Sequence, residues 1–126
     1  ENDIDNKKVL KNVNNSLQEN GIFILDFINI KKAILDLKEF EEKNINNINF
    51  KIYKHYDNRF IYKKIKITDQ KKRYIYTEKV RTLNQQNFIS YIKDLNIKLL
   101  HVFGDYNLNK FNPLLSERLL LVFQKH

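Results

Sequence analysis

The last third of the chain has the order of elements that most constrains the fold. Residues 88–95 predict a short helix capped by Asn84, and apolar runs at 98–103 and 118–123 predict two strands. A Gly-Asp-Tyr turn at 104–106 and a polar loop separate the two strands. A helix followed by two strands that are joined in this way is typical of one end of a mixed α/β sheet.

Glycine is scarce, because the chain has only Gly21 and Gly104. A loop that cradles the phosphates or ribose of a nucleotide needs several closely spaced glycines after a first strand. No such loop occurs in this sequence. The chain also has no methionine, so we expect that Glu1 is not a native start and that further residues precede it.

Composition narrows the class of protein. A chain of 126 residues with 42% apolar residues is long enough for one globular domain with a core. The absence of cysteine excludes disulfides, thiolate metal sites and cysteine catalysis, and it fits a cytoplasmic protein. His55, His101 and His126 lack the spacing of metal ligands, so we predict no metal site. No apolar run is long enough to span a bilayer, and we expect no membrane partner.

The first 47 residues predict a helix, a strand and a second helix. An apolar stripe predicts a helix over 6–19, which ends at Asn20-Gly21. The short apolar run 21–28 is typical of a strand that is covered on both faces, as in a parallel sheet. Apolar residues at helical spacing over 30–40 predict the second helix, and the polar stretch 41–47 ends it.

Residues 48–83 differ in character from the rest. Three strand-like runs, 49–56, 59–68 and 73–83, are joined by the short polar segments 57–58 and 69–72. Short polar joints between β-rich runs are typical of antiparallel hairpins. We therefore predict a three-stranded antiparallel meander.

Several segments resemble the class I S-adenosylmethionine-dependent methyltransferase family, in particular its small bacterial members. They are Ser-Leu-Gln-Glu-Asn-Gly-Ile-Phe-Ile-Leu-Asp-Phe at 16–27, Thr-Glu-Lys-Val-Arg at 77–81, and the two strand segments 98–109 and 116–123. The turn before the first of these strands departs from the family, since Glu19-Asn20 stands where the family has Pro-Gly. Together the similar segments cover nearly the whole chain.

The resemblance implies an α/β fold. Residues 1–126 would be the C-terminal part of a Rossmann-like methyltransferase sheet, with 48–83 as an inserted three-stranded antiparallel meander that caps the site. The N-terminal half, which binds most of the S-adenosylmethionine, would lie upstream of Glu1. The resemblance therefore assigns no cofactor-binding residue to this chain, and it implies that the fragment alone is inactive.

The site residues follow from the same resemblance. In an open α/β sheet, ligands bind at the carboxyl ends of the strands. Asp26 and Asp105 are the candidate catalytic residues, because a carboxylate there can orient or deprotonate the methyl acceptor. The candidate substrate-binding residues lie at the same strand ends or on the meander: Phe27, Asn29, Glu78, Arg81 and Tyr106.

Each of these residues also has a structural interpretation that the sequence leaves open. Asp26 can end a strand and cap the next helix, and Asp105 can form a turn, because Asp and Asn hydrogen-bond to nearby backbone. Glu78 and Arg81 can be ordinary members of cross-strand pairs.

The sequence leaves two classes of binding partner open. The expected partner is a small-molecule methyl acceptor, and a homodimer through the unpaired edge of the strand at 21–28 is a further expectation. The alternative is a non-catalytic module that binds nucleic acid or a partner protein. Residues 48–83 carry eleven Lys and Arg against three acidic residues, with seven aromatic residues interspersed. Such a surface suits RNA or single-stranded DNA, unless the aromatic rings face a core and the lysines face solvent.

Overall fold

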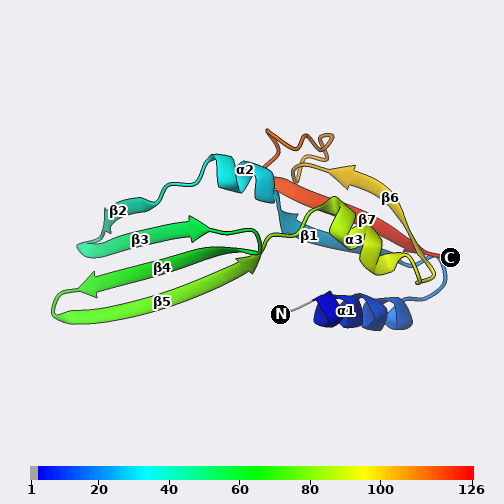
Figure 1. The fold of residues 1–126 in the computed structure, drawn as a ribbon, viewed down its shortest axis with the longest axis horizontal. Coiled ribbons are helices and arrows are strands. Elements are labelled where there is room, and N and C mark those ends of the chain that lie inside the picture. The colour runs from blue at the N-terminus through cyan, green and yellow to red at the C-terminus, as the bar shows by residue number, and fades with distance from the viewer. Residues whose placement is uncertain (1–2) are drawn as a thin grey trace. The chain divides into compact units, whose positions relative to one another are not determined.

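A computed structural model describes residues 3–126, which form two compact units (Figure 1). Residues 3–33 and 83–126 form the first, with α1 (Asp3–Ser16), β1 (Ile22–Ile28), α3 (Gln85–Ile92), β6 (Ile97–Phe103) and β7 (Arg118–Lys125). Residues 34–82 form the second, with β2 (Phe40–Ile45), β3 (Ile48–Tyr56), β4 (Phe60–Asp69) and β5 (Lys72–Arg81). The short helix α2 (Ile30–Leu35) spans the point where the first unit ends and the second begins.

The first unit has a three-stranded antiparallel sheet in the order β1-β7-β6. The central strand β7 carries the two most deeply buried side chains, Leu121 and Phe123, which have no exposed surface. Helices α1 and α3 supply apolar side chains to the same core, so a continuous cluster joins sheet and helices: Leu10, Leu83, Phe88, Tyr91, Ile92, Ile97, Leu119, Leu121 and Phe123. The two strands and the helix predicted for residues 84–123 are thereby confirmed.

The strand predicted at 21–28 is confirmed as β1, but its surroundings differ from the expectation. It pairs antiparallel with β7, and within residues 3–126 no strand pairs with its other edge. Alternate side chains pack on the core, whereas Ile22 and Ile24 on the opposite face are 50% and 60% exposed. An uninterrupted apolar run indicates burial on both faces, and in this chain only one face is covered.

The predicted first helix is confirmed as α1, but it ends at Ser16 and not at 19, and the predicted left-handed residue lies in the turn that follows. Asn20, in this turn, has a φ of 62°, which is the left-handed conformation. Gly21 follows in an ordinary conformation, but a Cβ atom there would lie 2.8 Å from the carbonyl oxygen of Gln18. Glycine is required at this position by the close approach of the backbone.

The predicted second helix over 30–40 was wrong in its second half. Helix α2 ends at Leu35, and Phe40–Ile45 instead form β2, which pairs antiparallel with β3. Asn46 and Asn47 have φ values of 51° and 65°, as the two central residues of a tight hairpin turn require. The pairing of β2 with β3 supplies backbone hydrogen bonds that outweigh a helical spacing of apolar residues.

The three predicted strands of the meander are confirmed as β3, β4 and β5, and β2 adds a fourth, in the order β2-β3-β4-β5. At the β3–β4 turn, Asp57 accepts hydrogen bonds from the backbone N–H groups of Arg59 and Phe60 at 2.7 and 2.8 Å. At the β4–β5 turn, Gln70 has a φ of 56°. None of residues 34–82, all of which the structure describes, is fully buried, so this unit is a single sheet with two accessible faces.

Over residues 3–126, no helix is both long enough and apolar enough to cross a bilayer.

Candidate active site

Two side chains from distant parts of the first unit contact the carboxylate of Asp26. Tyr106 donates a hydrogen bond from its hydroxyl to Oδ2 of Asp26 at 2.7 Å. Arg118 donates from Nε to Oδ1 of Asp26 at 2.9 Å, and Nη2 of the same guanidinium also lies 2.9 Å from Oδ1. We refer to Asp26, Tyr106 and Arg118 as the carboxylate cluster.

The sheet topology explains why these residues meet. Strands β1 and β6 both run antiparallel to β7, so their carboxyl ends lie at the same edge of the sheet. Asp26 lies near the end of β1, Tyr106 lies in the turn after β6, and Arg118 begins β7 at that edge. The carboxylate cluster therefore occupies the edge where open α/β sheets bind their ligands.

The turn that carries Tyr106 is held by Gly104. Its N–H donates to the carbonyl of Asn109 at 2.8 Å, and its own carbonyl accepts from the N–H of Arg118 at 2.9 Å. A Cβ atom at Gly104 would lie 2.1 Å from Oγ of Ser116. The β6 turn and the start of β7 are thus in close backbone contact, which only glycine permits here.

The cluster fixes the protonation states of its members. Partial burial would raise the pKa of Asp26, but hydrogen bonds from Tyr106 and Arg118, together with the Arg118 charge, outweigh it and lower that pKa below its ordinary value. The hydrogen bond to Asp26 raises the pKa of Tyr106. At neutral pH the cluster therefore contains a carboxylate, a neutral phenol and a guanidinium.

The pKa of Asp26 predicts how folding stability depends on pH. Since this pKa is lower in the folded than in the unfolded chain, its contribution is present above the unfolded value and is lost as pH falls through the folded value. We expect Asp26→Asn to lower the melting temperature at pH 7 and to make less difference at pH 3. The matched control is Asp94→Asn, at an exposed carboxylate that forms no ion pair within residues 3–126. An equal effect of Asp26→Asn at both pH values would contradict the assignment.

Asp105 lies next to the cluster in sequence but serves the turn. Its Oδ1 accepts from the N–H groups of Asn107 and Asn109 at 2.9 and 3.2 Å, and its Oδ2 accepts from the Asn109 side-chain amide at 2.9 Å. The Asn109 side-chain hydrogen bond is the largest cause of the lowered pKa of Asp105. This geometry is that of the turn-forming alternative.

Phe27 and Asn29 also have structural contacts. Phe27 packs against the core, and its ring lies edge-on to that of Phe88 at 5.4 Å between centroids. Asn29 is 4% exposed, and its side-chain amide donates to the carbonyls of Pro113 and Ser116 at 2.9 and 2.8 Å. Asn29 therefore fastens the loop before β7 to the end of β1, while Phe27 supports the strand from the core side.

Comparison with solved structures identifies the fold. A S-adenosylmethionine-dependent methyltransferase from Clostridium acetobutylicum superposes with a TM-score of 0.83 at 19% identity, over 98% of this chain and 52% of its own. The CcbJ methyltransferase from Streptomyces caelestis superposes with a TM-score of 0.82 at 9% identity, over 98% of this chain and 54% of its own. The fold is that of a partial methyltransferase. At these identities the likeness concerns the fold, and no protein-family model or curated protein matches the sequence.

The methyltransferase fold predicted from the resemblance is thus confirmed as mixed α/β with antiparallel sheets. The chain spans about half the length of the methyltransferases that it resembles. That coverage agrees with a C-terminal part of the fold.

Within the methyltransferase fold, the predicted residues Glu78 and Arg81 belong to the second unit. In the register of β4 and β5, Glu78 lies opposite Lys63 and Arg81 lies opposite Phe60. The Arg81 guanidinium lies 5.8 Å from the centre of the Phe60 ring. These contacts fit the interpretation of Glu78 and Arg81 as members of cross-strand pairs.

Sequence reasoning missed Arg118, which completes the carboxylate cluster. Arg118 lies in the segment 116–123, which resembles the methyltransferase family, but the sequence pattern predicted only a strand there and no role for the arginine. A basic residue that opens an otherwise apolar strand, beside a strand that ends in Asp26, was the available signal. Within residues 3–126, no group of three His, Asp or Glu side chains lies close enough together to hold a metal ion.

Proposed function

We propose that this chain is the acceptor-binding part of an S-adenosylmethionine-dependent methyltransferase that acts on a small molecule. The supporting observation is the carboxylate cluster at the carboxyl ends of β1 and β6, on a fold that matches methyltransferases over 98% of the chain. Ligands of open α/β sheets bind at such strand ends. We infer the use of S-adenosylmethionine from the fold.

The cofactor, when bound, supplies an electrophilic methyl group, and the protein mainly aligns the acceptor with it. No glycine-rich loop is present among residues 3–126, so we assign no cofactor contact to this chain. Its residues act on the acceptor side. That division agrees with a chain that spans about half of the matched methyltransferases.

Within this proposal, Asp26 orients the acceptor by accepting a hydrogen bond. Two nitrogens of Arg118 lie 2.9 Å from Oδ1, whereas Oδ2 accepts one hydrogen bond, from Tyr106, and can accept a second. The lowered pKa makes Asp26 a weak proton acceptor, which favours orientation over deprotonation. Arg118 holds the carboxylate in place, and Tyr106 remains a neutral donor beside it.

The geometry also indicates the kind of acceptor. A group with an N–H or O–H donor would bind the open lone pair on Oδ2 of Asp26. The Tyr106 side chain is 70% exposed, so its ring offers an apolar surface beside the carboxylate. We therefore expect a small acceptor that carries an amine or hydroxyl next to an apolar group.

The gene provides the first test. We expect the open reading frame upstream of the Glu1 codon to encode roughly 100 more residues, with a strand, a glycine-rich loop and a helix. An in-frame start codon close to Glu1, with no such segment, would contradict the proposal. A signal peptide directly before Glu1 would contradict it as well.

A further inference from the structure

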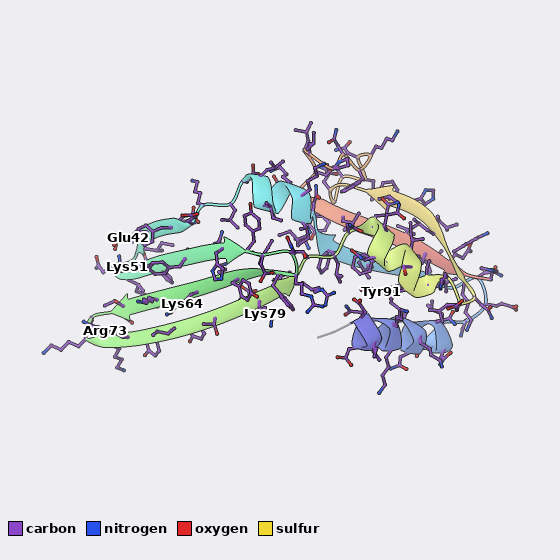
Figure 2. The ribbon with its side chains drawn as sticks, viewed as in Figure 1. Glu42, Lys51, Lys64, Arg73, Lys79 and Tyr91 are labelled. Carbon is purple, nitrogen blue, oxygen red and sulfur yellow. The ribbon has the colours of Figure 1, made fainter. Side chains whose placement is uncertain are left out.

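The positive charge of the second unit is concentrated on one face of its sheet. Because the register of β2 to β5 has no interruption, the residues that share a face can be read from the cross-strand pairs. One face, here called the basic face, carries a single carboxylate, Glu42. It also carries six basic side chains: Lys51, Lys64, Lys66, Arg73, Lys79 and Arg81. Figure 2 labels five of these seven residues along the four strands.

The opposite face balances its charges. It carries four lysines and three carboxylates, and Lys54 forms an ion pair with Glu41 at 3.7 Å. Lys63 lies directly opposite Glu78, and Lys72 lies opposite Asp69. Lys54 also lies opposite Lys63, but with three carboxylates for four lysines most of the charge on this face is compensated within the sheet.

The basic face has less compensation, because Glu42, which lies directly opposite Lys51, is its one carboxylate. Lys51 lies directly opposite Lys66, a like-charge pair that weakens a sheet. Five of the six basic side chains on this face form no ion pair within the described residues 3–126: Lys51, Lys64, Lys66, Arg73 and Lys79. All five are exposed. An anion bound across the strands would relieve this repulsion.

Aromatic rings lie among these cations on the same face. His55 stacks on Tyr62 with ring centres 4.5 Å apart and an angle of 11° between the planes. The Lys79 ammonium lies 4.0 Å from the centre of the Phe60 ring, and Tyr53 is 36% exposed. Tyr53, His55 and Tyr62 line a hollow of about 420 Å³, and its other lining residues are Lys63, Lys64, Thr77, Glu78 and Lys79.

This arrangement bears on the alternative that the sequence left open. A purely structural sheet would turn its aromatic rings to one face and its lysines to the other. The register instead places Tyr53, His55 and Tyr62 with Lys64 and Lys79. The isoleucines of β3 and β4 occupy the opposite face.

We propose that the basic face of residues 40–81 binds single-stranded nucleic acid. Lysines of this face contact the phosphates, and the rings of Tyr53, His55 and Tyr62 stack on unpaired bases. Every base has a flat aromatic face, so stacking of this kind tolerates different sequences. The inference is independent of methyl transfer, because it rests on the second unit alone.

Fluorescence anisotropy of the 126-residue chain with labelled 12-nucleotide oligothymidylate and oligouridylate tests the proposal. We expect binding at about 50 mM salt that weakens steeply as salt rises. The triple variant Lys51→Gln, Lys64→Gln, Lys66→Gln should lose affinity by on the order of a hundredfold at that salt. Its slope of log affinity against log salt should become shallower by about 2, since each single-strand phosphate contact contributes about 0.7.

The opposite face provides a control with the same change in charge. The variant Lys43→Gln, Lys54→Gln, Lys72→Gln alters the same sheet but leaves the basic face and the hollow intact. Its slope of log affinity against log salt should stay unchanged, because lysines on the opposite face contact no bound phosphate. Equal losses in both triple variants would overturn the proposal, and so would the absence of binding by the unaltered chain. Circular dichroism confirms that each variant is folded.

Stacking is tested separately. Tyr53→Leu should weaken binding by about tenfold, because stacking on one base contributes that much or more. Tyr76→Leu, on the opposite face at a residue that is 59% exposed, should leave binding unchanged. A 12-base-pair duplex should bind more weakly than the single strands. If the duplex binds as well as they do and Tyr53→Leu has no effect, the single-strand assignment fails.

Discussion

In the complete gene product, the proposed role of Asp26 in methyl transfer predicts that Asp26→Asn lowers kcat/KM by about a hundredfold or more. The change removes the negative charge that Arg118 and Tyr106 hold in place, and with it the acceptor of the substrate hydrogen bond. Misplacement of a bound group by about 1 Å is enough for a loss of this size. The measurement is transfer of a labelled methyl group from S-adenosylmethionine to small molecules of a deproteinised cell extract.

Asp105→Asn is the matched control, because it makes the same change at the other candidate carboxylate. Its oxygens are occupied by hydrogen bonds from Asn107 and Asn109, so we expect a lower melting temperature and a kcat within about threefold of the original. If Asp26→Asn leaves turnover unchanged in a folded enzyme, the proposed role of Asp26 is wrong. If Asp105→Asn abolishes turnover without loss of stability, Asp105 is the catalytic carboxylate.

Gly104→Ala is expected to lower the free energy of unfolding by about 1–3 kcal/mol, as an overpacked methyl group in a tight contact does. The added Cβ would lie 2.1 Å from Oγ and 2.6 Å from Cβ of Ser116, and 3.3 Å from Cα of Phe111. Because the Ser116 Cβ is fixed to the backbone, a rotation of the serine cannot relieve the contact. Urea denaturation measures the change.

A second substitution shows whether Ser116 is the cause. Ser116→Gly removes both clashing atoms, at the cost of the hydrogen bond that its hydroxyl accepts from the N–H of Asn112 at 2.7 Å. In the Ser116→Gly background we expect Gly104→Ala to cost at least about 1 kcal/mol less, a coupling typical of residues in contact. Additive effects would show that the loop adjusts elsewhere and would contradict the packing argument.

Much of the fold was predictable because local signals and tertiary pairing agree. The cap at Asn84 and the apolar run of β7 each form the predicted element. Asn20 has the predicted left-handed conformation, although α1 ends earlier, at Ser16. Residues 36–47 were not predictable from apolar spacing, since Phe40 fits a helix face and a strand equally well. The Asn46-Asn47 pair was the signal for the hairpin that decides between them.

The site was predictable only in part. Asp26 and Tyr106 were each expected at a strand end, and the structure brings them into contact across 80 residues of sequence. Arg118 reaches Asp26 because β1 pairs with β7, and no local sequence pattern indicates that pairing. Phe27 and Asn29 were predicted near the site only because they follow Asp26 in sequence. The alternation of the strand instead directs Phe27 to the core, and the buried Asn29 side chain donates a hydrogen bond to the carbonyl of Pro113 in the loop before β7.

The central claim is that this chain supplies the acceptor side of a methyltransferase. Calorimetric titration of the complete product of its gene with S-adenosylhomocysteine, the product of methyl transfer, tests that claim most directly. We predict saturable one-to-one binding by the complete product, and no measurable binding by residues 1–126 alone. A folded complete product that does not bind S-adenosylhomocysteine would contradict the account, whatever the basic face binds.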